Sequence, residues 1–108
     1  MNQKLIVAMV KTRYTDAIID AVKEAGGTGA TIIEAKGTGM YEAKTFFGLT
    51  LEQQTDVVLF LVEENQVEPI LDTIYRTGHL KEAGTGIAFV LDVERAIGLE
   101  SQRERSGR

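Results

Sequence analysis

The sequence predicts an α+β fold: one four-stranded antiparallel sheet with two helices on one face. Apolar runs of strand length alternate with stretches of helical periodicity, in the order strand, helix, strand, long loop, strand, helix, strand. The two halves also repeat, because LIVAMV aligns with VVLFLV, AIIDAV with PILDTI, and GGTGATII with AGTGIAFV. Two strand–helix–strand units pack most simply in the ferredoxin-like (βαββαβ) arrangement.

The first half has a clear order of elements. Residues 4–10 (KLIVAMV) are nearly all apolar, as expected for a buried strand. Thr15 is expected to cap the next helix, in which apolar residues recur at helical spacing until Gly26-Gly27 end it. Residues 30–35 (ATIIEA) are the second expected strand.

The second half repeats the pattern after a loop from Lys36 to Gln54. Residues 56–62 (DVVLFLV) predict a strand, and 67–77 a helix with Pro69 in its first turn, where proline is tolerated. A loop follows to Gly86, and residues 87–91 (IAFVL) predict the last strand. Residues 93–97 are expected to form a short helical turn.

Composition describes one globular domain over residues 1–100 and a basic tail at 101–108, which is expected to be disordered. Residues 1–100 carry 9 basic and 15 acidic side chains, which disfavours nucleic acid as a partner. There is no cysteine, and no apolar run reaches 18 residues. We therefore expect neither a disulfide, a spanning helix nor a signal peptide, and a cytoplasmic location.

The first and third strands are apolar at successive positions, which indicates burial on both faces. Two helices cover only one face of the predicted sheet. The chain is therefore expected to associate with copies of itself through the other face.

Gly-Thr-Gly occurs three times, at 27–29, 37–39 and 84–86. Such turns expose backbone N–H groups that can cradle a phosphate. The first and third copies follow a helix and open a strand, the reverse of the order in common nucleotide-binding loops. The first is expected to serve only as a helix end and strand entry.

Three segments together resemble PII-type signalling proteins: GGTGATIIEAKGTG (26–39), VVLFLVEEN (57–65) and YRTGHLKEAGTGIAFVLDVERAIGL (75–99). The resemblance covers residues 3–99. It implies a homotrimer that binds an adenine nucleotide (AMP, ADP or ATP) between subunits. It also implies control of a partner, often a membrane transporter, through a protruding T-loop, here about residues 37–54. The glycine-rich B-loop corresponds to about 78–86.

Two groups of binding residues are expected, partly from the resemblance and partly from the character of the residues themselves. Tyr41, Phe46, Phe47 and Leu49 of the T-loop would contact a partner protein; by their apolar character alone, they could equally pack between subunits. The nucleotide would contact Met9, Thr31, Gly37, Thr38, Gly39, Met40, Leu61, His79, Lys81, Gly84, Thr85 and Gly86.

The chain departs from the family pattern at charged positions. Ile87 stands where the B-loop lysine is usual, and Gly98 and Glu100 stand in place of two arginines. His79 and Lys81, on a longer B-loop, are candidates to replace that charge, although a lone loop histidine is more often solvated. Phe46 replaces the modified tyrosine and Tyr41 the glutamine that helps hold magnesium and 2-oxoglutarate. An orthodox nitrogen regulator is therefore not expected.

The main hypothesis is a non-enzymatic nucleotide sensor without a tightly bound cofactor. It would act in the cytoplasm and at the membrane only through its partner. The alternative is a module of the same fold for a small anion such as bicarbonate, or for a cyclic nucleotide. One histidine and scattered carboxylates supply no catalytic set, and no metal cluster is evident.

Overall fold

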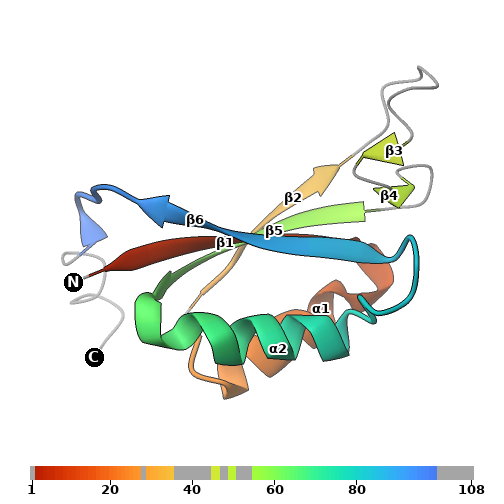
Figure 1. The fold of residues 1–108 in the computed structure, drawn as a ribbon, viewed down its shortest axis with the longest axis horizontal. Helices are drawn as coiled ribbons and strands as arrows, with labels where there is room; N and C mark the ends of the chain where they lie inside the picture. The colour runs from red at the N-terminus through yellow and green to blue at the C-terminus, as the bar shows by residue number, and fades with distance from the viewer. Residues whose placement is uncertain (1, 28, 36–44, 47–48, 51–54, 100–108) are drawn as a thin grey trace.

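The computed structural model describes residues 2–27, 29–35, 45–46, 49–50 and 55–99. Four strands form an antiparallel sheet in the order β2-β5-β1-β6, and two helices lie against one face of it (Figure 1). The predicted α+β fold is confirmed. The elements are β1 (Gln3–Lys11), α1 (Thr12–Glu24), β2 (Thr31–Ala35), β5 (Thr55–Glu63), the 3-10 turn η2 (Glu64–Gln66), α2 (Val67–Thr77) and β6 (Gly86–Val93).

The core lies between the sheet and the helices. Alternate residues of β1 and β5 point to this side, because successive strand side chains face opposite ways. Phe60 of β5 is 1% exposed, and it packs with apolar side chains of both helices. Full burial of each large apolar side chain contributes roughly 1.5–3 kcal/mol. The rest of the buried core is Ile6, Ala8, Val10, Ile18, Val22, Val58, Val62, Ile70 and Ile74.

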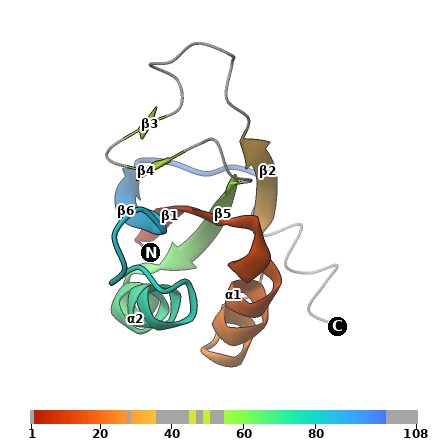
Figure 2. The same cartoon turned by 90° about the vertical axis from the view of Figure 1, so that its right-hand side faces the viewer.

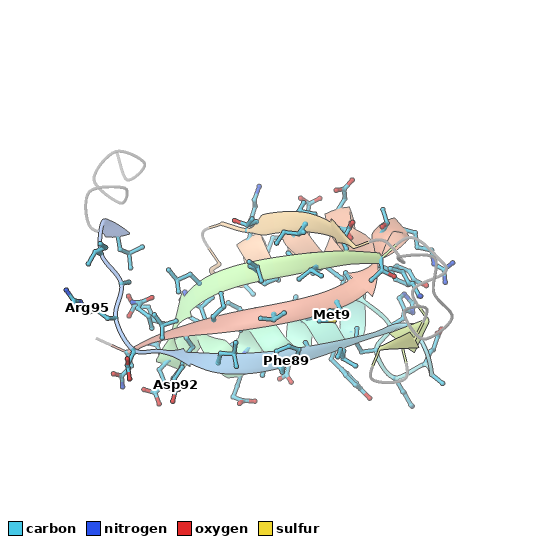
Figure 3. All side chains as sticks on the ribbon, turned by 90° about the horizontal axis from the view of Figure 1, so that it is seen from above. Met9, Phe89, Asp92 and Arg95 are labelled. Carbon is cyan, nitrogen blue, oxygen red and sulfur yellow. The ribbon has the colours of Figure 1, made fainter. Side chains whose placement is uncertain are left out.

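The other side of the sheet is also apolar, and among the described residues no helix covers it. Figure 3 looks down on this open face and labels Met9 and Phe89. Leu61 and Leu91 remain 38% and 48% exposed there. The predicted uncovered apolar face is thus present, and self-association through it stays a prediction. The residues that share it are Leu5, Val7, Met9, Ile33, Val57, Leu59, Leu61, Ile87, Phe89 and Leu91.

Three local expectations are wrong. α1 begins at Thr12, so Thr15 lies within the helix and does not cap it. The expected loop 36–54 contains a short antiparallel pair, β3 (Thr45–Phe46) with β4 (Leu49–Thr50), and the rest lies outside the described residues. β6 continues to Val93, and residues 94–96 adopt no regular structure in place of the expected helical turn.

The Thr15 hydroxyl has a tertiary partner, which explains why it is not a cap. Its Oγ1 donates a 2.7 Å hydrogen bond to Oδ2 of Asp56 on β5. Thr15 and Asp56 are only 3% and 4% exposed. A buried carboxylate needs such donors, because water does not reach it.

A Thr15→Val substitution is therefore expected to lower the free energy of unfolding by about 1–3 kcal/mol, the cost of leaving a buried polar group without its partner. Urea unfolding followed by circular dichroism measures it. Thr77→Val in the last turn of α2 is the matched control, since Thr77 is less buried. Equal stability of the two variants would contradict this role for Thr15.

None of the helices in the described ranges combines the length and the hydropathy needed to cross a bilayer.

Candidate functional site

One end of the sheet carries the glycine turn and the start of the expected T-loop, two of the segments that the sequence singled out for binding. The register places Thr55 opposite both Lys11 and Ala35, and Val10 opposite Gly86. At this end α1 begins, the chain leaves β2 and returns to β5, and the segment after α2 enters β6 (Figure 1). We call it the turn end. The β3–β4 pair also lies at this end, on the side away from the helices (Figure 2).

The glycine turn, residues 78–86, is held by its own hydrogen bonds. The backbone N–H of Glu82 donates to the His79 carbonyl at 3.0 Å, and that of Thr85 donates to the Glu82 carbonyl at 3.3 Å. The Thr85 hydroxyl lies 2.6 Å from the His79 carbonyl and 2.8 Å from the Glu82 carbonyl. Because Thr85 is 7% exposed and its hydroxyl is engaged within the turn, a ligand here would meet mainly backbone groups.

At two positions of this turn the structure requires glycine, for a different reason at each. Gly84 has φ +80°, a left-handed conformation that costs other residues free energy. Gly86 has an ordinary φ but lies against β1: a Cβ added there would sit 2.6 Å from the Met9 carbonyl oxygen. Gly86 therefore lets β6 pair closely with β1 beside Met9.

His79 contacts α1, which sequence reasoning did not foresee. Its ring stacks on Tyr14 with centroids 4.4 Å apart and planes inclined by 25°. The guanidinium carbon of Arg13 lies 5.0 Å from the centroid of the Tyr14 ring. His79 Nδ1 lies 3.5 Å from Oε2 of Glu82, an ion pair when the imidazole is protonated. His79, expected to be solvated, is thus half-exposed and contacts both Tyr14 and Glu82.

Lys11, the residue before α1, adds a buried amine to the turn end. It is 4% exposed, and burial lowers the pKa of its ammonium group, with the positive charge of Arg13 acting in the same direction. The unfolded chain therefore holds this proton more tightly. Stability should rise with pH between the lowered pKa and the ordinary value of 10.5.

The structure brings only some of the predicted nucleotide residues together. Met9 lies beside the glycine turn, which carries His79, Lys81, Gly84, Thr85 and Gly86. Thr31 lies on β2, opposite Leu59 of β5. Leu61 lies on β5, two residues after Leu59.

These two groups lie on different sides of the sheet's middle. β2 and β6 are its opposite edge strands. Three spacings of about 4.8 Å between neighbouring strands put these edges about 14 Å apart. One copy therefore does not bring Thr31 to the glycine turn.

The remaining predicted residues fall within residues 37–54, the expected T-loop. Phe46 and Leu49 pair in the β3–β4 hairpin, where only the backbone is described. Five others lie outside the described residues together with Phe47: Gly37, Thr38, Gly39, Met40 and Tyr41. In the part of the chain that is described, no group of three or more His, Cys, Asp or Glu side chains is placed to hold a metal ion.

Comparison with known proteins identifies the family. Residues 3–103 match the family model described as nitrogen regulatory protein P-II. The chain is 32% identical to nitrogen regulatory protein P-II 1 of Escherichia coli K12 over 106 residues, which cover 94% of this chain and 95% of that protein. This chain belongs to the P-II family. The P-II protein of Pasteurella multocida is 28% identical with the same coverage.

Solved structures agree with the fold. A CPII protein from Thiomonas intermedia K12, bound to ADP, AMP and acetate, superposes with a TM-score of 0.68 at 20% identity, covering 92% of this chain and 93% of that one. A putative PII-like signalling protein from Thermus thermophilus gives 0.66 at 22% identity, covering 93% and 95%. The P-II family is regulatory, so this chain is a P-II family signalling protein.

Proposed function

We propose that this P-II family protein is a homotrimeric, non-enzymatic sensor of adenine nucleotides. The placement of the two predicted groups of nucleotide residues on different sides of the sheet's middle, toward its β2 and β6 edges, carries the proposal. A site split in this way becomes complete where the β6 edge of one copy meets the β2 edge of the next. The open apolar face gives those copies a reason to associate.

The ligand chemistry follows from the glycine turn and from the fold neighbour. Backbone N–H groups around Gly84 and Gly86 suit a phosphate, and His79 and Lys81 lie on the turn itself. The Thiomonas protein holds ADP and AMP. The residues named for this ligand stay as predicted: Met9, Thr31, Gly37, Thr38, Gly39, Met40, Leu61, His79, Lys81, Gly84, Thr85 and Gly86.

The output is proposed to be a T-loop that changes with nucleotide occupancy and binds or releases a partner protein. Differential affinity of the ligand for two loop states supplies the coupling. Tyr41, Phe46, Phe47 and Leu49 are the proposed partner contacts. Following the habit of the family, the partner is a membrane transporter, and the sensor is cytoplasmic and reaches the membrane only through it.

Titration calorimetry with AMP, ADP and ATP tests the sensor. We expect one nucleotide per subunit and a rise in melting temperature by mass action, about 2.7 kcal/mol of stabilisation at a ligand concentration one hundred times the dissociation constant. Adenosine is the control, because it lacks the phosphate that the glycine turn would hold. No heat and no thermal shift with any of the three at millimolar concentration would end this proposal.

A second function has one specific observation in its favour. No lysine or arginine lies between Gly84 and Gly86, and Ile87 follows, so a triphosphate would meet less positive charge than in other family members. A small carboxylate-like anion needs less positive charge than a triphosphate, and the Thiomonas structure also holds acetate. Bicarbonate, acetate and cyclic AMP therefore belong in the same titration series. Binding of one of these without ADP would favour the anion module.

A further inference from the structure

The ring contact between Tyr14 and His79 joins two segments 65 positions apart in the sequence. Tyr14 lies in the first turn of α1 and also packs against the core. His79 is the second residue of the glycine turn. Stacked rings at 4.4 Å are attractive beyond the area they bury. The start of α1 is thereby attached to the turn that leads into β6.

His79 is also the residue on which the turn is organised. It has φ +59°, a left-handed conformation that is uncommon outside glycine. Its carbonyl accepts the Glu82 N–H at 3.0 Å and lies 2.6 Å from the Thr85 hydroxyl. A change in the His79 backbone would therefore move Thr85 and the glycines on either side of it.

Side chain and backbone of His79 thus have separate tasks. The imidazole stacks on Tyr14 of α1, and the carbonyl accepts hydrogen bonds from the Glu82 N–H and the Thr85 hydroxyl. Arg13 over Tyr14 and Glu82 beside Nδ1 place one charge of each sign around the stack. The Thr85 hydroxyl on the His79 carbonyl links His79 directly to the residue between Gly84 and Gly86.

We propose that Tyr14 is a positioning residue for the phosphate-binding turn and acts through its stack on His79. This stack holds Gly84, Thr85 and Gly86 in the conformation that accepts a nucleotide phosphate, so a ring on α1 sets the affinity of a site that it does not touch. A turn that samples other conformations binds more weakly, in proportion to the fraction of competent molecules. This inference rests on the proposed nucleotide site.

The test compares three variants by ADP titration at fixed salt and protein concentration. Tyr14→Leu removes the ring and keeps the apolar packing. His79→Asn removes the imidazole and keeps a residue that tolerates the left-handed conformation. Both are expected to bind ADP about 3- to 10-fold more weakly, the size of one lost ring pair. Tyr14→Phe keeps the ring and should bind within twofold of the unaltered protein.

Nuclear magnetic resonance supplies a readout that a loss of general stability would not reproduce. The sequence has a single histidine, so the imidazole C–H signals belong to His79. Stacking on Tyr14 should shift them upfield, and Tyr14→Leu should abolish this shift while Tyr14→Phe retains it. Tyr75→Leu, an exposed tyrosine of α2, is the matched control and should change neither signal nor affinity.

Unchanged ADP affinity in Tyr14→Leu, with the His79 signals moved, would overturn the inference and leave the sensor proposal standing. If the unaltered protein binds no nucleotide, the sensor proposal fails instead. Amide hydrogen exchange at Gly84 and Gly86 then decides the positioning role. Faster exchange in Tyr14→Leu and His79→Asn, but not in Tyr14→Phe, would support it, and equal exchange in all three would overturn it.

Discussion

A Phe89→Glu substitution is expected to convert the proposed trimer into a monomer of 11.8 kDa. Phe89 lies on β6 opposite Val7 and points to the open face that Figure 3 looks down on. In the proposed assembly this position is buried between copies. An unpaired carboxylate buried there should cost about 3–5 kcal/mol and weaken association at least 100-fold.

Sedimentation or light scattering at micromolar protein measures the mass, with about 35 kDa expected for three copies of 11.8 kDa. Tyr75→Glu is the matched control, because Tyr75 is an exposed aromatic residue of the helical layer, 50% accessible. It should leave the assembly intact. A mass of 11.8 kDa for the unaltered protein, or an unchanged assembly in Phe89→Glu, would contradict self-association through the sheet.

A Gly86→Ala substitution should lower the free energy of unfolding by about 3 kcal/mol, the upper range for overpacking. The added Cβ would lie 2.6 Å from the Met9 carbonyl oxygen, a backbone atom that cannot turn aside. Either β6 or β1 must move, which strains the pairing of Val10 with Gly86. Denaturant unfolding at one fixed protein concentration measures the loss.

Two other glycines separate crowding from backbone strain. Gly84→Ala meets nothing within 4 Å but must adopt φ +80°, so it should lose about 1 kcal/mol. Gly29→Ala has open space and no positive φ, and its stability should stay equal or rise slightly. If Gly86→Ala proves as stable as Gly29→Ala, the close approach to Met9 has no energetic weight.

The fold was predictable because its signals are local and repeated. The apolar runs at 4–10 and 56–62 became β1 and β5, and the helical period at 67–77 became α2 with Pro69 in its first turn. The uncovered apolar face followed from counting the faces that two helices can cover. Periodicity carries this information because burial on a strand or helix repeats with the geometry of the backbone.

The errors arise where a side chain has a distant partner. Thr15 is of a residue type that often caps helices, yet its hydroxyl donates a hydrogen bond to Asp56, 41 residues later. The stack of His79 on Tyr14 joins two elements whose proximity is set by the tertiary packing of α1. No local spacing signals either contact. The Thr85 hydroxyl also bonds inside its own turn, and the ligand contact that the family resemblance implies for Thr85 stays a prediction.

The placement of β2 and β6 at opposite borders of the sheet has a consequence for mixed assemblies. If each nucleotide lies between two neighbouring subunits, every subunit contributes its β2 half-site to one interface and its β6 half-site to the other. A variant altered at the β2 half of the site and a second variant altered at the β6 half should each fail to bind nucleotide on its own. When the two variants are dissociated, mixed and reassembled, some interfaces should combine two unaltered half-sites. Nucleotide binding should return at those interfaces, which is complementation between subunits.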